Sequence, residues 1–195
     1  MESVQLDSGD YSGTYKLIGG HSSLDLINTI SWPGSERAHD WLNTPENLQR
    51  WLRAVGLPPA PRKDLDLKAV AELRTHLNSV LRPMARQERP APKAVDELNR
   101  LIAKAHLRRA IDPRTLAWAW KVPANTLDAL APVVMDAAEL VTAQDHDRLR
   151  YCPSCDWLFE DQTRNGQRRW CDMADCGSRD KARRYYQRTR EGAGE

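Results

Sequence analysis

The feature that most constrains this chain is the spacing of its four cysteines, all of which lie in the last quarter. The pattern is C-x2-C, fifteen further residues, then C-x4-C. Two close pairs joined by a segment long enough to fold back can place four thiolates around one tetrahedral Zn²⁺. A catalytic zinc keeps an open position, and four thiolates leave none. The spacing therefore predicts one structural Zn²⁺ per chain, bound by Cys152, Cys155, Cys171 and Cys176.

Two other uses of cysteine pairs fit this chain less well. Disulfides belong to oxidising compartments, and residues 1 to 30 show neither a basic segment nor an apolar run of the secretory kind. A redox C-x-x-C usually lies near the start of a βαβ unit. No apolar run approaches the ~20 residues that cross a bilayer, so no membrane partner is expected. These observations predict a protein of the reducing cytoplasm.

The charge of the chain is concentrated at its C-terminal end. The net charge is +2, but residues 162 to 190 hold nine basic residues against three acidic ones, which is +6 and leaves −4 for the rest. A basic arm on a mildly acidic body favours nucleic acid as the partner, although a merely solvated charged face remains an alternative. We expect DNA contacts from Arg164, Arg168, Arg169, Arg179, Lys181, Arg183, Tyr186 and Arg190.

The first three quarters of the chain show the periodicity of helices. Thr44-Pro45 is a strong helix start and Gly56 a typical stop, so a helix is expected over 45–55. Apolar residues at helical spacing predict further helices over about 22–30, 64–87, 92–109 and 125–141, the last with a kink at Pro132. Residues 115–122 alternate large and small side chains and are the best strand candidate. The fold class expected is mainly α, within α+β.

A polar group of residues near the N-terminus predicts a ligand site. Gly20 and His21 precede a helix start, where backbone N–H groups and an imidazole can bind an anion. Asp25 and Asn28 lie one helical turn apart and share a face. We expect Gly20, His21, Asp25 and Asn28 to line a pocket for an unknown small molecule beneath Trp118 or Trp120. A purely structural role for these polar groups stays open.

The run from Cys155 to Lys181 resembles the CGNR-type zinc finger. In that family the last cysteine opens the signature Cys-Gly-Asn-Arg-x-Lys, and here Ser178 replaces the asparagine. The segments Gly19–His21, Leu24–Thr29 and Ala117–Trp120 resemble the ABATE domain that usually precedes such fingers. The resemblance implies a bacterial protein with a helical domain over 1–147, carrying a short strand pair, and a treble-clef-like finger over 148–195. It also implies a role in transcription regulation, often linked to stress.

The treble-clef arrangement makes specific expectations for the finger. Residues 157–170 should form a hairpin, and Cys176 should open the terminal helix. Ser178, Ala182, Tyr185 and Thr189 should pack against that hairpin, which leaves Arg179, Arg183, Tyr186 and Arg190 facing DNA. One or two of the basic residues should instead pair with Asp161, Asp172 or Asp175. The helical domain and the finger are expected to have separate cores.

These expectations favour a DNA-binding transcription regulator with a ligand-sensing or oligomerising helical domain, and they leave homodimerisation open. One alternative is a zinc-dependent adaptor that docks an acidic protein without binding DNA. Another is an enzyme that uses the N-terminal pocket. Nucleophile-elbow, P-loop and dinucleotide-binding motifs do not occur in the sequence, which argues against an enzyme.

Overall fold

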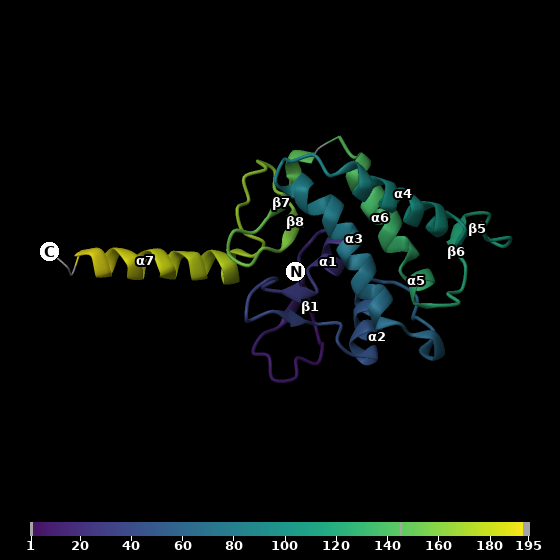
Figure 1. The fold of residues 1–195 in the computed structure, drawn as a ribbon, viewed down its shortest axis with the longest axis horizontal. Helices are drawn as coiled ribbons and strands as arrows, with labels where there is room; N and C mark the ends of the chain where they lie inside the picture. The colour runs from purple at the N-terminus through teal and green to yellow at the C-terminus, as the bar shows by residue number, and fades with distance from the viewer. Residues whose placement is uncertain (1, 145, 193–195) are drawn as a thin grey trace.

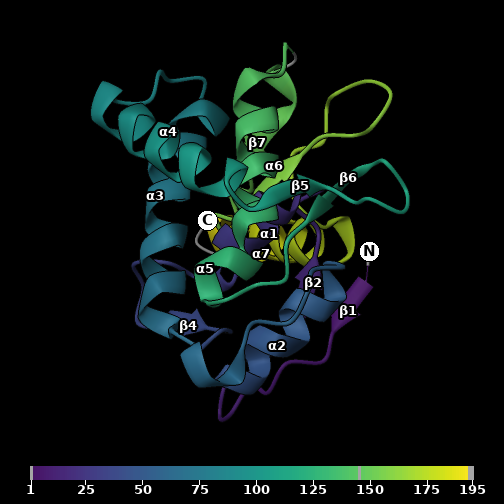
Figure 2. The same cartoon turned by 90° about the vertical axis from the view of Figure 1, so that its right-hand side faces the viewer.

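Helices form most of the body, and four small antiparallel strand pairs lie around them (Figures 1 and 2). The computed structural model describes residues 2–144 and 146–192. The helices are α1 (Ser22–Ile27), α2 (Pro45–Ala54), α3 (Leu67–Ala85), α4 (Pro92–His106), α5 (Thr126–Ala129), α6 (Ala131–Thr142) and α7 (Ser178–Gly192). The strand pairs are β1 (Glu2–Val4) with β2 (Tyr15–Leu17), β3 (Ile30–Ser31) with β4 (His39–Asp40), β5 (Arg109–Ile111) with β6 (Trp118–Trp120), and β7 (Leu149–Tyr151) with β8 (Leu158–Glu160). This architecture confirms the predicted fold class.

Local sequence signals account for most of the helix boundaries. Thr44 caps α2 by accepting a hydrogen bond from the backbone N–H of Asn47 at 3.2 Å, and Pro45 occupies the first turn. Asp66 caps α3 in the same way. The segment predicted as one helix over 125–141 is two helices, because the chain breaks at Leu130 and Pro132 begins a new first turn in α6.

A central helix, α3, organises the core. Its buried face contacts α1, α4, α5 and α6, with Leu73, Leu77 and Leu81 almost completely inaccessible. The same helix contacts β7 of the finger. Leu149, Leu158 and Phe159 of the finger belong to one continuous buried cluster with the helical residues. The expectation of separate cores is therefore wrong: the strands of the finger lie on α1 and α3 and complete the core there.

The terminal helix α7 extends away from this body (Figure 1). Viewed along the long axis, α7 lies behind the middle of the molecule (Figure 2). Every described side chain from 181 to 190 is exposed. The helix leaves the body directly after the cysteine-bearing turn, so the metal site forms its base.

Candidate functional site

The four cysteines converge in space as their spacing predicts. Their Sγ atoms all lie within 4.8 Å of one another, with 3.4 Å between Cys155 and Cys171 and 3.6 Å between Cys171 and Cys176. Bonds of about 2.3 Å from a tetrahedral zinc to sulfur require sulfurs about 3.8 Å apart. All four thiols are free and buried. The donor set and its spacing fit one structural Zn²⁺, which stabilises the fold through its four bonds and leaves no position for a substrate.

A tight turn between β7 and β8 presents the first pair of ligands. The N–H of Cys152 donates to the carbonyl of Trp157, and the N–H of Asp156 donates to the carbonyl of Cys152, both at 2.8 Å. Asp156 has a φ of 65°, the left-handed conformation that aspartate tolerates better than most residues. Hydrogen bonds within the cluster lower the pKa of Cys152 and raise the pKa of Cys155 and of Cys171, so the four thiols share their protons. Zinc binds the thiolate form of cysteine.

The hairpin predicted over 157–170 does not form, because β8 pairs with β7 and the chain after it is a loop. The buried carboxylate of Asp161 replaces the missing strand contacts. It accepts hydrogen bonds from the N–H and hydroxyl of Thr163, at 3.0 and 2.6 Å, and from the N–H of Arg168 at 2.7 Å. Burial opposes ionisation of Asp161, but these hydrogen bonds outweigh it and lower its pKa. A single carboxylate therefore shapes the loop that leads to Cys171.

Two arginines predicted to touch DNA make contacts within the finger. Arg168 donates to the carbonyls of Trp170 and Cys171, and its guanidinium lies 4.8 Å from the centre of the Phe159 ring. Arg179 donates to the Sγ of Cys176 at 3.0 Å and lies 5.0 Å from the centre of the Trp32 ring. Hydrogen bonds to ligand sulfurs orient the ligand and stabilise its negative charge. Both arginines thus support the metal site.

The remaining predicted contacts lie on the surface. Arg164, Arg169, Lys181, Arg183, Tyr186 and Arg190 are all exposed. Arg183 and Arg184 pair with Asp180, at 2.9 and 3.0 Å, although both stay more than half exposed. The acids expected to pair with basic residues of 162–190 have other ion-pair partners: Lys16 contacts both Asp172 and Asp175, and Arg150 is the partner of Asp161. Two basic residues of this segment do form ion pairs, as expected, but their partner is Asp180 and not one of the three acids named in the prediction.

The expected packing of α7 is not observed. Ser178, Ala182, Tyr185 and Thr189 are exposed, because the hairpin that was to cover them does not form. Ser178, at the position of the family's asparagine, donates to the carbonyl of Met173 at 3.4 Å. From residue 181 onward the helix therefore presents all of its sides to solvent.

Residues predicted to line a ligand pocket contact both the finger and the helical domain. Asn28 is 1% exposed, and its amide donates to the carbonyl of Leu158 and accepts from the N–H of Leu158, both at 2.8 Å. The carbonyl of Gly19 accepts from the N–H of Glu160, also at 2.8 Å. Asn28 and Gly19 thereby satisfy the free edge of β8. This role reaches across 130 residues of sequence, which is why the sequence does not show it.

Asp25 and His21 belong to the same junction. Asp25 accepts from the N–H groups of Ile18 and Gly19 at 3.1 and 2.8 Å, and burial raises its pKa to about 6. A Cβ on Gly19 would lie 2.7 Å from the Cβ of Leu24, so only glycine fits this approach. His21 lies between Asp136 of α6 and Glu160 of β8, with nitrogen-to-oxygen distances of 2.9 and 3.4 Å. The polar groups of Asp25, Asn28 and His21 are thus engaged with the protein itself.

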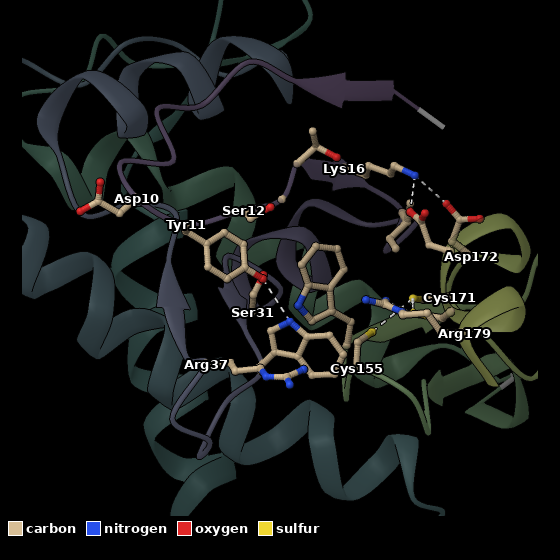
Figure 3. A pocket seen from close by; sticks show the side chains of 17 residues that line it. Asp10, Tyr11, Ser12, Lys16, Ser31, Arg37, Cys155, Cys171, Asp172 and Arg179 are labelled. Carbon is tan, nitrogen blue, oxygen red and sulfur yellow. Dashed lines mark hydrogen bonds and ion pairs between the residues drawn. The ribbon is translucent and has the colours of Figure 1, made fainter. Parts of the chain in front are cut away.

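Trp118 and Trp120 do not cover a pocket at His21, Asp25 and Asn28. They lie in the β5–β6 hairpin, where Trp118 is 63% exposed and flanks Arg109. A cavity near the finger lies elsewhere, between the N-terminal segment and the zinc ligands (Figure 3). His21, Asp25 and Asn28 therefore have structural contacts, and Gly20, with a φ of 86°, lies beside Glu160 and Gln162. A ligand role for these four residues stays a prediction.

The fold and the site together define a zinc-finger protein whose finger is built into a helical domain. The chain belongs to the ABATE family, because the family model described as "Putative stress-induced transcription regulator" matches residues 20–144. The model for the CGNR zinc finger matches residues 148–189. Both agree with the resemblance seen in the sequence. No curated protein matches the chain.

These descriptions name a regulator and a zinc finger, and neither names an enzyme. Among the described residues, no helix is both long and apolar enough to cross a membrane.

Proposed function

We propose that this protein is a DNA-binding transcription regulator that uses α7 and the adjoining surface of the finger as its nucleic-acid contact. The observation that carries the proposal is an exposed helix with basic residues on two opposite sides. Lys181, Arg184 and Arg188 lie on one side of α7, and Arg183 and Arg190 lie on the other. An isolated helix of about 15 residues is marginal in water, so a helix without a packed face gains stability from a partner. A polyanion supplies negative charge that neutralises this basic surface.

The zinc centre supports the proposal by setting the direction of α7. Cys176 lies in the turn Met173–Gly177 directly before the helix, and Arg179 in its first turn is held against a ligand sulfur. The base of the helix is therefore rigid while its basic length is accessible. Arg164 and Arg169 of the adjoining loop are exposed and extend the basic surface. A protein with this role acts where DNA and a reducing environment occur together, so the proposal includes action in the bacterial cytoplasm.

The test is titration of zinc-loaded protein into labelled duplex DNA at several salt concentrations. About four phosphate contacts give a slope of log K against log salt of about −3.6. Arg190 has no ion pair among the described residues, so Arg190→Gln should make the slope shallower by about 0.9. Tyr186→Ala should weaken binding with little change in slope, because stacking releases no counterions. Arg53→Gln, an exposed arginine on α2, is the matched control and should change neither quantity.

A second candidate function is an adaptor that docks an acidic protein through the same helix. The exposed Tyr185 and Tyr186, at 61% and 67%, favour it because aromatic residues are enriched at protein interfaces. Polyglutamate added as a competitor separates the two. Affinity for duplex that is indifferent to salt, or unchanged by deletion of residues 179 to 195, would overturn the DNA proposal.

A further inference from the structure

A cavity of about 520 Å³ lies beside the zinc ligands, with Arg179 at the base of α7 in its wall. It opens between the N-terminal segment, the loop around Trp32 and the cysteine cluster (Figure 3). Sites for small organic molecules usually measure about 300–1,000 Å³ and combine aromatic walls with a few polar groups. This cavity therefore has the size of a ligand site, and its lining shows which ligand it suits.

Three aromatic side chains form much of the wall, namely Tyr11, Trp32 and Trp157. Tyr11 is held from behind by stacking on His39, with ring centres 4.3 Å apart and an angle of 7°. The indole of Trp32 donates to the hydroxyl of Tyr11 at 3.0 Å. Trp157 donates to the carbonyl of Ile30 at 2.9 Å. Each ring is thus fixed by the protein before any ligand enters, which suits a flat aromatic ligand.

The backbone at Trp32 is a second sign of a built site. Its φ is 52°, a left-handed conformation that is costly for a bulky residue. Strain of this kind persists where the surrounding structure holds it, and it is concentrated at ligand sites. Here the conformation is accompanied by the indole bond to Tyr11 and by the Arg179 guanidinium at 5.0 Å.

The unused hydrogen-bonding groups of the cavity are chiefly donors. The Tyr11 hydroxyl accepts from Trp32, and the Ser31 hydroxyl accepts from Trp41 at 2.8 Å, so each keeps its own hydrogen to donate. Arg37 has no ion pair among the described residues. Arg179 uses one N–H for Cys176 and has others left.

The acids of the cavity are differently placed. Asp172 and Asp175 both contact Lys16. Asp10 stands at the edge, and its carboxylate points away from the other labelled side chains (Figure 3). The groups free to meet a ligand therefore favour one that carries acceptors and negative charge.

We propose that this cavity binds a small aromatic carboxylate, with its ring against Tyr11, Trp32 and Trp157 and its carboxylate toward Arg37 and the Tyr11 hydroxyl. A guanidinium matches the two oxygens of a carboxylate. The lining comes from both the N-terminal segment and the finger, so the ligand stabilises their junction. The proposal does not depend on DNA binding.

The experiment measures binding of 2-naphthoate to the zinc-loaded full chain by calorimetry and by thermal unfolding, without DNA. A ligand of the native state raises the unfolding temperature as its concentration exceeds Kd. We expect 2-naphthoate to bind and stabilise, and the uncharged 2-naphthalenemethanol and the cationic 2-naphthylmethylamine to bind at least about tenfold more weakly.

Two variants locate the site. Arg37→Gln should weaken 2-naphthoate about tenfold while leaving the uncharged analogue unchanged, and Tyr11→Phe should have a smaller effect in the same direction. Arg37 is exposed, so its replacement leaves the fold intact, and Arg53→Gln is the matched control. Absence of 2-naphthoate binding at millimolar concentration, equal binding of all three probes, or equal loss in Arg37→Gln and Arg53→Gln would each overturn the proposal.

Discussion

At the scale of single residues, the junction between finger and helical domain depends on side chains that imitate backbone. The amide of Asn28 gives Leu158 both of the hydrogen bonds that a neighbouring strand would provide. The carboxylate of Asp161 does the same for the loop before Cys171. Buried amides and carboxylates that satisfy backbone in this way are costly to remove, because the groups they leave behind stay unpaired.

Asn28→Ala should therefore destabilise the protein by about 2–6 kcal/mol, since two buried backbone groups of Leu158 lose their partners at roughly 1–3 kcal/mol each. Urea unfolding followed by circular dichroism measures this change. Asn99→Ala, on the exposed side of α4, is the matched control and should cost under about 0.5 kcal/mol. Equal costs for the two variants would show that the Leu158 bonds contribute nothing.

His21 predicts a pH dependence of the same junction. The hydrogen bond to Asp136, with the charges of Asp136 and Glu160, raises its pKa above the ordinary value despite burial. A base with a raised native pKa stabilises the fold fully below its unfolded pKa of about 6.5, and the contribution is lost as pH rises through the native value. Stability should thus fall above about pH 6.5 in the wild type, and His21→Gln should remove this part of the fall. Identical pH profiles for both proteins, measured by urea unfolding, would contradict it.

At the scale of elements, α7 differs from the six other described helices in lacking a buried face. α3 buries one side along its whole length, whereas α7 is exposed from 181 onward. Helices in proteins derive most of their stability from packing. The zinc ligand Cys176 fixes only the beginning of α7, so its outer turns depend on their own hydrogen bonds.

Amides of residues 183 to 190 should therefore exchange with solvent much faster than those of α3, and duplex DNA should slow them. Hydrogen exchange read by mass spectrometry measures both, with the α3 peptides as internal control. Strong protection of α7 without DNA, or unchanged exchange in a sample saturated with duplex, would be the contrary result.

At the scale of the whole molecule, the zinc finger and the helical domain share one buried core. Leu149, Trp157 and Phe159 belong to the same buried cluster as the helical residues, and Trp157 also donates to Ile30. A metal that stabilises the finger thus stabilises the core against α1 and α3 as well. Separate cores would let the helical domain stay folded when the finger unfolds. The shared core predicts that the two lose stability together.

Cys171→Ser or removal of zinc by chelation should lower the stability of the entire chain. Structural zinc contributes about 10–16 kcal/mol in isolated fingers, which rivals the total stability of a domain. Helix content and tryptophan fluorescence should decrease together in one transition shifted to lower temperature. Ser154→Ala, between the first two ligands, is the control and should retain the wild-type transition. Two transitions, with the helical one unshifted, would restore the view of separate cores.

The sequence by itself determined those features that depend on neighbours along the chain. The caps of α2 and α3 follow from Thr44 and Asp66, and the four zinc ligands follow from two short cysteine spacings. Local hydrogen bonds and chelation need only residues a few positions apart, so their pattern is visible in one dimension.

Only the tertiary structure decided what the polar and basic side chains do. Arg168 and Arg179 have the same charge as Arg190, yet two of them hold the zinc site and the third is free. Asn28 and His21 meet partners in β8 that lie more than 100 residues away. The missing hairpin follows from β8 pairing back to β7 rather than forward. Long-range pairing sets which groups are buried, and burial decides whether a charge or an amide is structural or available to a partner.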